Sequence, residues 1–141
     1  MLSSMPITDD IQRVAGAIER PRAGYVRRLD EARQMIAPRS VEASRQLEVF
    51  LDRVDGLTAG ELRELYTETF RGEAVAVRRL LGRLARTPMD GAGACTAVSA
   101  LAPLLERLDT ERNPFAHVVR ALCCLLLGRA KSPQLEASRG S

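Results

Sequence analysis

Apolar residues recur at intervals of three and four along almost the whole chain, and this spacing restricts the fold more than any other feature. The clearest stretch follows Thr58 and places its inward-facing side chains at i, i+3, i+4, i+7 and i+8: Leu62, Leu65, Tyr66, Thr69 and Phe70. Such spacing gathers side chains on one face of an α-helix. No segment has the alternation that is typical of a half-buried strand. We therefore predict an all-α fold.

Capping residues, glycines and prolines divide the chain into six or seven short helices. Capping groups mark the predicted starts: Thr8 to Asp10, Ser40, Thr58 with Glu61 in a capping box, and Asn113 before Pro114. Glycine or a following proline marks the predicted ends: Pro21, Pro38, Gly56, Gly72, Pro88 and Gly128. The last helix, residues 115–127, is apolar nearly all round, so we expect it to lie buried at the centre of a single bundle.

The length of 141 residues fits one domain, which we place at residues 8–128, with flexible termini at 1–7 and 129–141. Residues 88–94, PMDGAGA, are the one internal stretch with the composition of a loop. We expect the next helix to begin near Thr96 and to be kinked or started later by Pro103. Because a glycine-rich loop lets later helices exchange between copies, we expect a monomer or a domain-swapped dimer.

Residues that usually act as catalysts or metal ligands are scarce in this chain. Cys95, Cys123 and Cys124 contain no C-x-x-C pair, and the single His117 cannot supply a multi-histidine metal centre. Phosphate-binding, nucleophile-elbow and zinc-protease motifs are missing. We therefore expect no enzymatic activity, no metal and no cofactor, and we interpret His117 as a packed or surface imidazole and the adjacent cysteines as inert thiols.

The same features suggest where the protein works. Cysteines without a disulfide pattern favour a reducing compartment, so we expect a cytoplasmic protein. No apolar run approaches the ~20 residues of a membrane-spanning helix, and we expect no secretory signal in the first residues.

Charged residues gather in two places. Residues 71–86 hold five arginines and one acid, Glu73, which keeps a helical nucleic-acid-binding regulator open as an alternative function. Glu61, Glu64 and Glu68 form a stripe beside the apolar face of the helix after Thr58. This stripe is either a solvated surface paired with Arg63 or Arg71, or the acidic rim of a groove that receives a basic peptide.

Residues 56–70 resemble the signature of the NarJ/TorD-type chaperones, the nitrate reductase delta-subunit family, in which a pattern like L-x-E-x-Y-x-x-T-F ends a central helix. Glu64, Tyr66, Thr69 and Phe70 match this pattern. Residues 19–38 are similar to an early segment of the family, and Asn113-Pro114-Phe115-Ala116 looks like the start of its final buried helix. The chain departs from the family in its short length, in Arg71 where an aspartate is usual, and in lacking a histidine near Pro88.

The resemblance implies a system-specific, non-catalytic chaperone. Its partner would be the apo catalytic subunit of a molybdenum-cofactor oxidoreductase such as a nitrate reductase, bound at an N-terminal segment that often carries a twin-arginine signal. Binding would assist cofactor insertion and assembly before export or membrane docking. On this interpretation Tyr66 and Phe70 line an apolar trough, and Glu61, Glu64 and Glu68 meet the arginines of the client. A permanent adaptor subunit of a redox complex is the second alternative, and we expect no nucleic acid partner.

Overall fold

The computed structural model describes residues 6–19, 24–70, 74–108 and 112–140, with the backbone alone at 6, 7, 74 and 130–140. Helices are the only regular elements in these ranges, which confirms the all-α prediction. They are α1 (Pro6–Glu19), α2 (Tyr25–Ile36), α3 (Val41–Val54), α4 (Ala59–Phe70), α5 (Ala74–Arg86), α6 (Gly91–Arg107) and α7 (Phe115–Gly140). None of these helices, over the described residues, is both long and apolar enough to cross a membrane.

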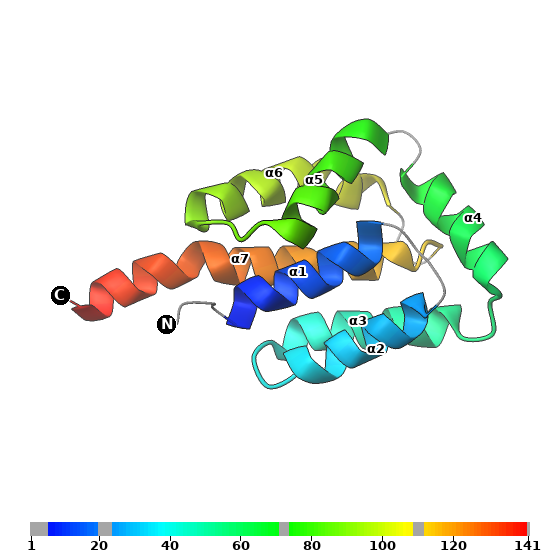
Figure 1. The fold of residues 1–141 in the computed structure, drawn as a ribbon, viewed down its shortest axis with the longest axis horizontal. Coiled ribbons are helices and arrows are strands. Elements are labelled where there is room, and N and C mark those ends of the chain that lie inside the picture. The colour runs from blue at the N-terminus through cyan, green and yellow to red at the C-terminus, as the bar shows by residue number, and fades with distance from the viewer. Residues whose placement is uncertain (1–5, 20–23, 71–73, 109–111, 141) are drawn as a thin grey trace.

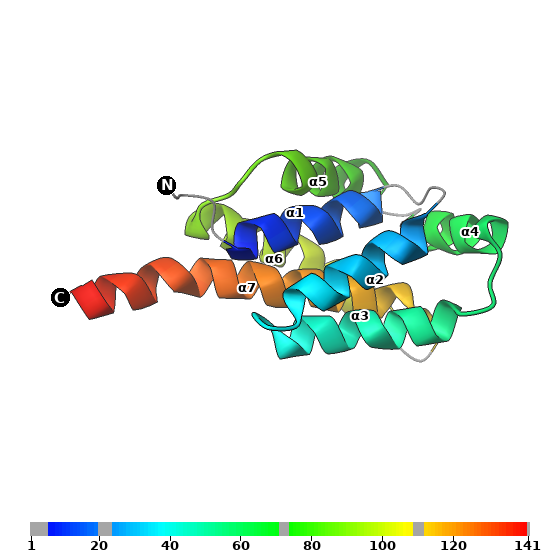
Figure 2. The same cartoon turned by 60° about the horizontal axis from the view of Figure 1, so that its bottom comes forward.

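Helix α7 runs through the middle of the bundle and packs against α6, α3 and α1 (Figure 1). Helix α1 in turn packs against α5 and α2, and α2 packs against α3. Helix α4 lies apart from these pairs, across the end of the bundle where α7 begins, and Figure 2 shows the same placement from another side. The bundle therefore has α7 as its axis and α4 at one end.

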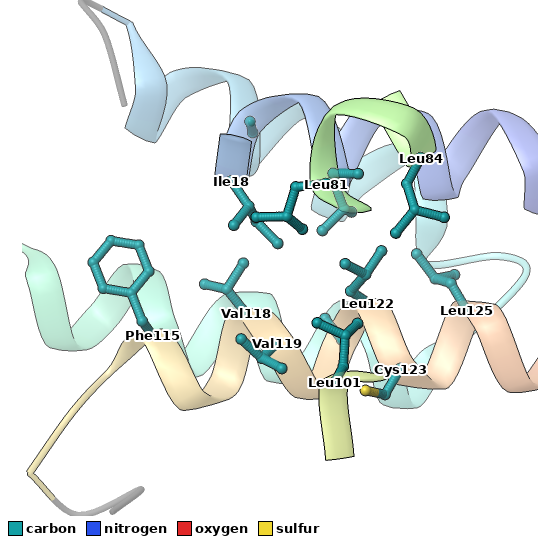
Figure 3. Close-up of a cluster of buried hydrophobic side chains, with 14 of the residues drawn as sticks. Ile18, Leu81, Leu84, Leu101, Phe115, Val118, Val119, Leu122, Cys123 and Leu125 are labelled. Carbon is teal, nitrogen blue, oxygen red and sulfur yellow. The ribbon is translucent and has the colours of Figure 1, made fainter. Parts of the chain in front are cut away.

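The core forms on α7, as its all-round apolar sequence predicts. Phe115, Val118, Leu122 and Leu125 are fully buried. Figure 3 shows the side chains from α1 and α5 that point toward this helix: Ile18, Leu81 and Leu84. Leu101 of α6 lies on another side of α7, beside Val119 and Cys123. An apolar helix thus finds partners all round because it is the central element.

Three of the predicted helix starts are confirmed by their hydrogen bonds. The hydroxyl oxygen of Ser40 accepts from the amide of Ala43 at the start of α3. Thr58 and Glu61 form the reciprocal capping box, with distances of 3.1 Å from Glu61 N to Thr58 Oγ1 and 2.9 Å from Thr58 N to Glu61 Oε1. The amide of Phe115 donates to Asn113 Oδ1 at 3.0 Å. Local capping chemistry therefore sets these boundaries.

Three predicted boundaries are wrong. Helix α1 begins at Pro6, so the predicted cap residues Thr8 and Asp10 lie inside the helix and are buried. Helix α6 begins at Gly91 and not near Thr96, because Asp90 caps it by accepting from Gly93 N at 2.7 Å. Helix α7 passes through Gly128 and ends at Gly140, since a single glycine is tolerated within a helix. Residues 129–140 are therefore helical, where a flexible terminus was expected.

The predicted break at Gly72 and the stop at Pro21 lie outside the described residues. Pro103 lies within α6, which is one helix from Gly91 to Arg107, so the later start considered for this proline is wrong.

Asp10 does not cap a helix as predicted, but forms an ion pair with Arg39. Its side chain is fully buried and accepts hydrogen bonds from Nε and Nη2 of Arg39, which follows α2, and from Nη1 of Arg13 at 3.3 Å. A buried carboxylate needs such partners to offset its lost hydration. The forked Arg39 contact ties the first turns of α1 to the turn between α2 and α3.

Candidate functional site

The aromatic residues of the chain, two tyrosines and three phenylalanines, form one cluster at the end of the bundle. Phe115 is its centre, with ring centroids 5.1 Å from Phe50, 5.8 Å from Tyr66, 6.0 Å from Phe70 and 6.3 Å from Tyr25. These spacings are typical of favourable aromatic pairs. The cluster joins α2, α3, α4 and α7, so it attaches the isolated helix α4 to the bundle.

Polar contacts beside this cluster link α4 to the start of α7. The hydroxyl of Thr69 donates to the carbonyl oxygen of Leu65 at 2.7 Å and accepts from Asn113 Nδ2 at 2.8 Å. The other end of the Asn113 amide caps α7. Two of the motifs that carry the family resemblance, 44 residues apart at Thr69 and Asn113, therefore touch each other in the fold.

Tyr66 and Phe70 do not line a trough, and this part of the sequence interpretation is corrected. Their side chains are 5% and 3% exposed and pack in the aromatic cluster. The hydroxyl of Tyr66, which we expected at a rim, donates instead to the backbone carbonyl of Glu19 at the end of α1. A tyrosine can be buried when its hydroxyl has such a partner. These two residues anchor α4.

The opposite side of α4 is acidic and exposed. Glu64 and Glu68 line an open hollow of about 470 Å³ together with Arg63 and Thr67. Glu61 lies one turn earlier, exposed, with its carboxylate accepting from Thr58 N. No cation within the described ranges forms an ion pair with any of these three glutamates, and Arg71 lies outside those ranges. The structure thus brings Glu64 and Glu68 together and separates them from Tyr66 and Phe70.

His117 has a hydrogen-bond partner, and burial makes the thiol of Cys123 unreactive. Nδ1 of His117 lies 2.8 Å from Gln46 Oε1, and burial lowers its pKa, helped by the positive charges of Arg53 and Arg120. Burial raises the pKa of the Cys123 thiol to about 11, so the reactive thiolate is scarce at neutral pH. Cys95 is exposed. No group of three potential metal ligands occurs among the residues that the structure describes.

Two further surface features lie away from α4. An open hollow of about 380 Å³ lies on the surface where α1 meets α2 and is lined by Arg13, Gly16, Ala17, Arg28, Glu31, Ala32 and Met35. The arginines of α5 at positions 78, 79, 83 and 86 are all exposed, and Arg86 forms an ion pair with Glu19 at 3.4 Å. Sequence periodicity missed the hollow because it forms between two helices whose packing is not local. The Arg71 and Glu73 positions of the predicted basic segment are not described.

No model of a known protein family matches this chain, and neither a curated protein nor a solved structure matches it. The resemblance to the NarJ/TorD-type chaperones therefore rests on the motif residues alone.

Proposed function

We propose that this protein is a cytoplasmic chaperone that binds the N-terminal segment of the catalytic subunit of a molybdenum-cofactor oxidoreductase. It holds that subunit while the cofactor is inserted and before export or membrane docking. The client segment carries adjacent arginines, and its docking surface is the exposed acidic side of α4, with Glu64 and Glu68 at the centre and Glu61 one turn away. The protein itself performs no catalysis.

The observation that supports this proposal most is that the two sides of α4 differ: one packs against the bundle, and the other exposes carboxylates. The motif residues Tyr66, Thr69 and Phe70 attach the helix to the bundle from one side. The carboxylates of Glu64 and Glu68 stay exposed on the other side, without an ion pair among the described residues, and border a hollow. The hollow is lined by two carboxylates and one guanidinium, that of Arg63, so its net negative charge suits recognition of a cationic segment.

Arginine is the cation that suits these carboxylates best. Its planar guanidinium donates two parallel hydrogen bonds to one carboxylate. Glu64 and Glu68 are four residues apart on a helix, so their Cβ atoms lie ~6 Å from each other and two neighbouring arginines can each reach one of them. Thr67, between them in sequence, adds a hydroxyl to the lining. Because these groups are exposed, we expect modest affinity with a strong dependence on salt.

The direct test is calorimetric titration with a synthetic peptide that copies the N-terminus of a molybdenum oxidoreductase catalytic subunit, including its two adjacent arginines. We expect the Glu64→Gln/Glu68→Gln variant to bind about tenfold more weakly than the wild-type protein. The matched control is Asp52→Asn/Glu106→Gln, which neutralises two exposed carboxylates on α3 and α6 and should bind like the wild type.

Two results would contradict the proposal: equal binding of a peptide with both arginines replaced by glutamine, or equal loss in the control variant.

The chaperone role has its own test, which separates it from a permanent adaptor subunit. Tagged protein should recover a catalytic subunit that lacks its molybdenum cofactor, and it should release that subunit once the cofactor is loaded. Recovery of cofactor-loaded enzyme in a stable complex would instead identify an adaptor. Recovery of no oxidoreductase subunit in repeated experiments would overturn the assignment of the client.

A further inference from the structure

Helix α5 has a basic outer face that the proposed function does not use. Four residues of this helix are spaced by four, four and three positions, so they share one side of it: Val75, Arg79, Arg83 and Arg86. All four are exposed, and Val75 is 66% exposed. The opposite side packs into the core through buried aliphatic residues: Val77, Leu80, Leu81 and Leu84. Core packing therefore holds the valine and the arginines outward.

The arginines of α5 outnumber the acids that neutralise them. Arg78, beside the basic face, is also exposed. Of the four arginines, only Arg86 forms an ion pair in the part of the chain that the structure describes, with Glu19 at 3.4 Å. The helix itself contains no acidic residue from Ala74 to Arg86. This side of the bundle therefore has a net positive charge.

The helices that pack against α5 add few carboxylates. On α1, Asp9 and Asp10 act on Arg39, which donates hydrogen bonds to Asp10. Helix α6 has no charged side chain before Glu106, and Asp90 caps its first turn. The acidic hollow belongs to α4, which lies across the end of the bundle and does not pack closely against α5 among the described residues (Figure 1).

We propose that the basic face of α5 binds the surface of a membrane that contains anionic phospholipids. Arg79 and Arg83 lie one turn apart and donate hydrogen bonds to headgroup phosphates, a ligand that the planar guanidinium suits. Val75 enters the boundary between headgroups and acyl chains. Figure 2 shows α5 at the outer edge of the bundle, beyond α1, where a flat surface can approach it. The attachment is peripheral, because the aliphatic side of α5 stays in the core.

A membrane surface fits this face better than a nucleic acid does. The exposed Val75 gains nothing from a phosphate backbone, whereas it gains an apolar environment at a lipid interface. Helix α5 carries no asparagine, glutamine, serine or threonine that could contact base edges. The five aromatic residues of the chain, which could stack on unpaired bases, are all buried in the aromatic cluster.

Membrane binding has a consequence that rests on the proposed function. A chaperone attached through α5 would keep its client at the membrane, where export or docking follows. The acidic hollow on α4 would stay available, because a different helix makes the attachment. The membrane contact itself does not depend on the client.

Co-sedimentation of the full chain with lipid vesicles tests the contact without any peptide. We expect binding in about 20 mM salt to phosphatidylcholine vesicles with about one third phosphatidylglycerol, and release in about 500 mM salt. Vesicles of phosphatidylcholine alone should not bind. Arg79→Gln/Arg83→Gln should weaken binding about 25-fold, since each arginine near an anionic surface contributes about fivefold.

The matched control is Arg27→Gln/Arg45→Gln, which removes the same charge from exposed positions on α2 and α3. This variant should bind the vesicles like the wild type. Circular dichroism checks that every variant is folded.

Fluorescence tests the apolar part of the contact. The chain contains no tryptophan, so a single introduced one reports only its own surroundings. The emission of Val75→Trp should shift to the blue on anionic vesicles, because tryptophan prefers the membrane interface. Val41→Trp is the matched control: Val41 is 68% exposed at the start of α3, and its variant should show no shift.

Three outcomes would overturn the membrane contact: no binding to anionic vesicles in low salt, equal binding by Arg79→Gln/Arg83→Gln, or unshifted emission from vesicle-bound Val75→Trp. A chain that ignores the vesicles and binds a random DNA duplex through these arginines would identify a nucleic acid instead. Peptide titration without vesicles measures client binding separately. Peptide binding through Glu64 and Glu68 without vesicle binding would thus refute the membrane contact and leave the proposed function intact.

Discussion

At the scale of single residues, two tyrosines in one aromatic cluster differ in how their hydroxyls are satisfied. The hydroxyl of Tyr66 donates to the backbone carbonyl of Glu19, whereas the hydroxyl of Tyr25 is buried without a hydrogen-bond partner among the described residues. Burial and the nearby Tyr66 raise the pKa of Tyr25 well above its ordinary value. An unsatisfied buried hydroxyl destabilises the folded state because it has lost its hydrogen bonds to water.

The same substitution should therefore have opposite effects at these two positions. Tyr25→Phe removes the unsatisfied hydroxyl and should increase the free energy of unfolding by about 1 kcal/mol. Tyr66→Phe removes the donor to the Glu19 carbonyl and should decrease it by about 1 kcal/mol. Urea unfolding followed by circular dichroism measures both. A shift of the two variants in the same direction would contradict the hydrogen-bond assignment.

His117 makes stability depend on pH. Burial and the charges of Arg53 and Arg120 lower its pKa below the ordinary 6.5, so the folded protein binds the proton less readily than the unfolded chain does. The contribution of His117 to the free energy of unfolding is therefore fully present above the unfolded pKa of about 6.5. It is lost as the pH falls from there through the lower pKa of the folded protein.

The His117→Gln variant should lose part of this dependence. Between about pH 7 and pH 5, its free energy of unfolding should fall less than that of the wild type, because glutamine does not titrate. Carboxylates that titrate in the same range are common to both proteins and cancel in the comparison. Equal slopes from unfolding curves across this pH range would show that His117 is not the group responsible.

At the scale of helices, Asn113 joins the start of α7 to α4. Its amide oxygen accepts from Phe115 N at 3.0 Å, and its amide nitrogen donates to Thr69 Oγ1 at 2.8 Å. We expect Asn113→Ala to destabilise the protein by about 1–2 kcal/mol, since both hydrogen bonds are lost. Thr69→Val, which keeps the shape of the side chain, should destabilise by about 1 kcal/mol.

The double variant tests whether these two residues act together. If they share one hydrogen bond, the two losses should not add, and the coupling energy should be at least ~0.5 kcal/mol. Urea unfolding of the four proteins in the cycle gives this value. Strict additivity would mean that the Asn113–Thr69 contact contributes nothing to the attachment of α4.

Helices whose boundaries depend on local chemistry could be predicted from the sequence. The capping box at Thr58 and Glu61 needs only neighbouring residues, and the all-round apolar pattern of residues 115–127 is enough to place that helix at the centre. The start of α6 is also set by a local cap, Asp90, which the sequence analysis missed. Glycine and alanine favour a loop after Pro88, but the Asp90 cap and packing against α7 outweigh that preference.

Whether each face of α4 is buried or exposed depends on residues that are distant in the sequence. Periodicity correctly separates Tyr66 and Phe70 from Glu64 and Glu68 on α4. It cannot tell a core-facing aromatic from one that borders a groove, because the Tyr66 hydroxyl finds its acceptor 47 residues away at Glu19. The hydrogen bond from Arg39 to the buried Asp10, 29 residues away, is unpredictable for the same reason.

At the scale of the whole molecule, α1, α3 and α6 pack against α7, and α4 is a single helix that lies across one end of this bundle (Figure 2). Aromatic packing fixes α4 from the inside, and its carboxylates face outward. The hollow between α1 and α2 is the alternative docking surface, because it is also open to solvent. Arg13 and Arg28 line it. Its two arginines outnumber its one acid, Glu31, and disfavour a cationic segment, whereas Glu64 and Glu68 outnumber Arg63 in the hollow on α4 and favour one.

Chemical-shift mapping of the labelled protein with the arginine-containing client peptide compares these two surfaces directly. If α4 binds the client, the largest amide shifts should occur at Glu64, Thr67 and Glu68, and they should disappear in the Glu64→Gln/Glu68→Gln variant. Shifts confined to the Arg13 to Met35 hollow, or no shifts at peptide excess, would contradict the account of α4 as the client-binding helix.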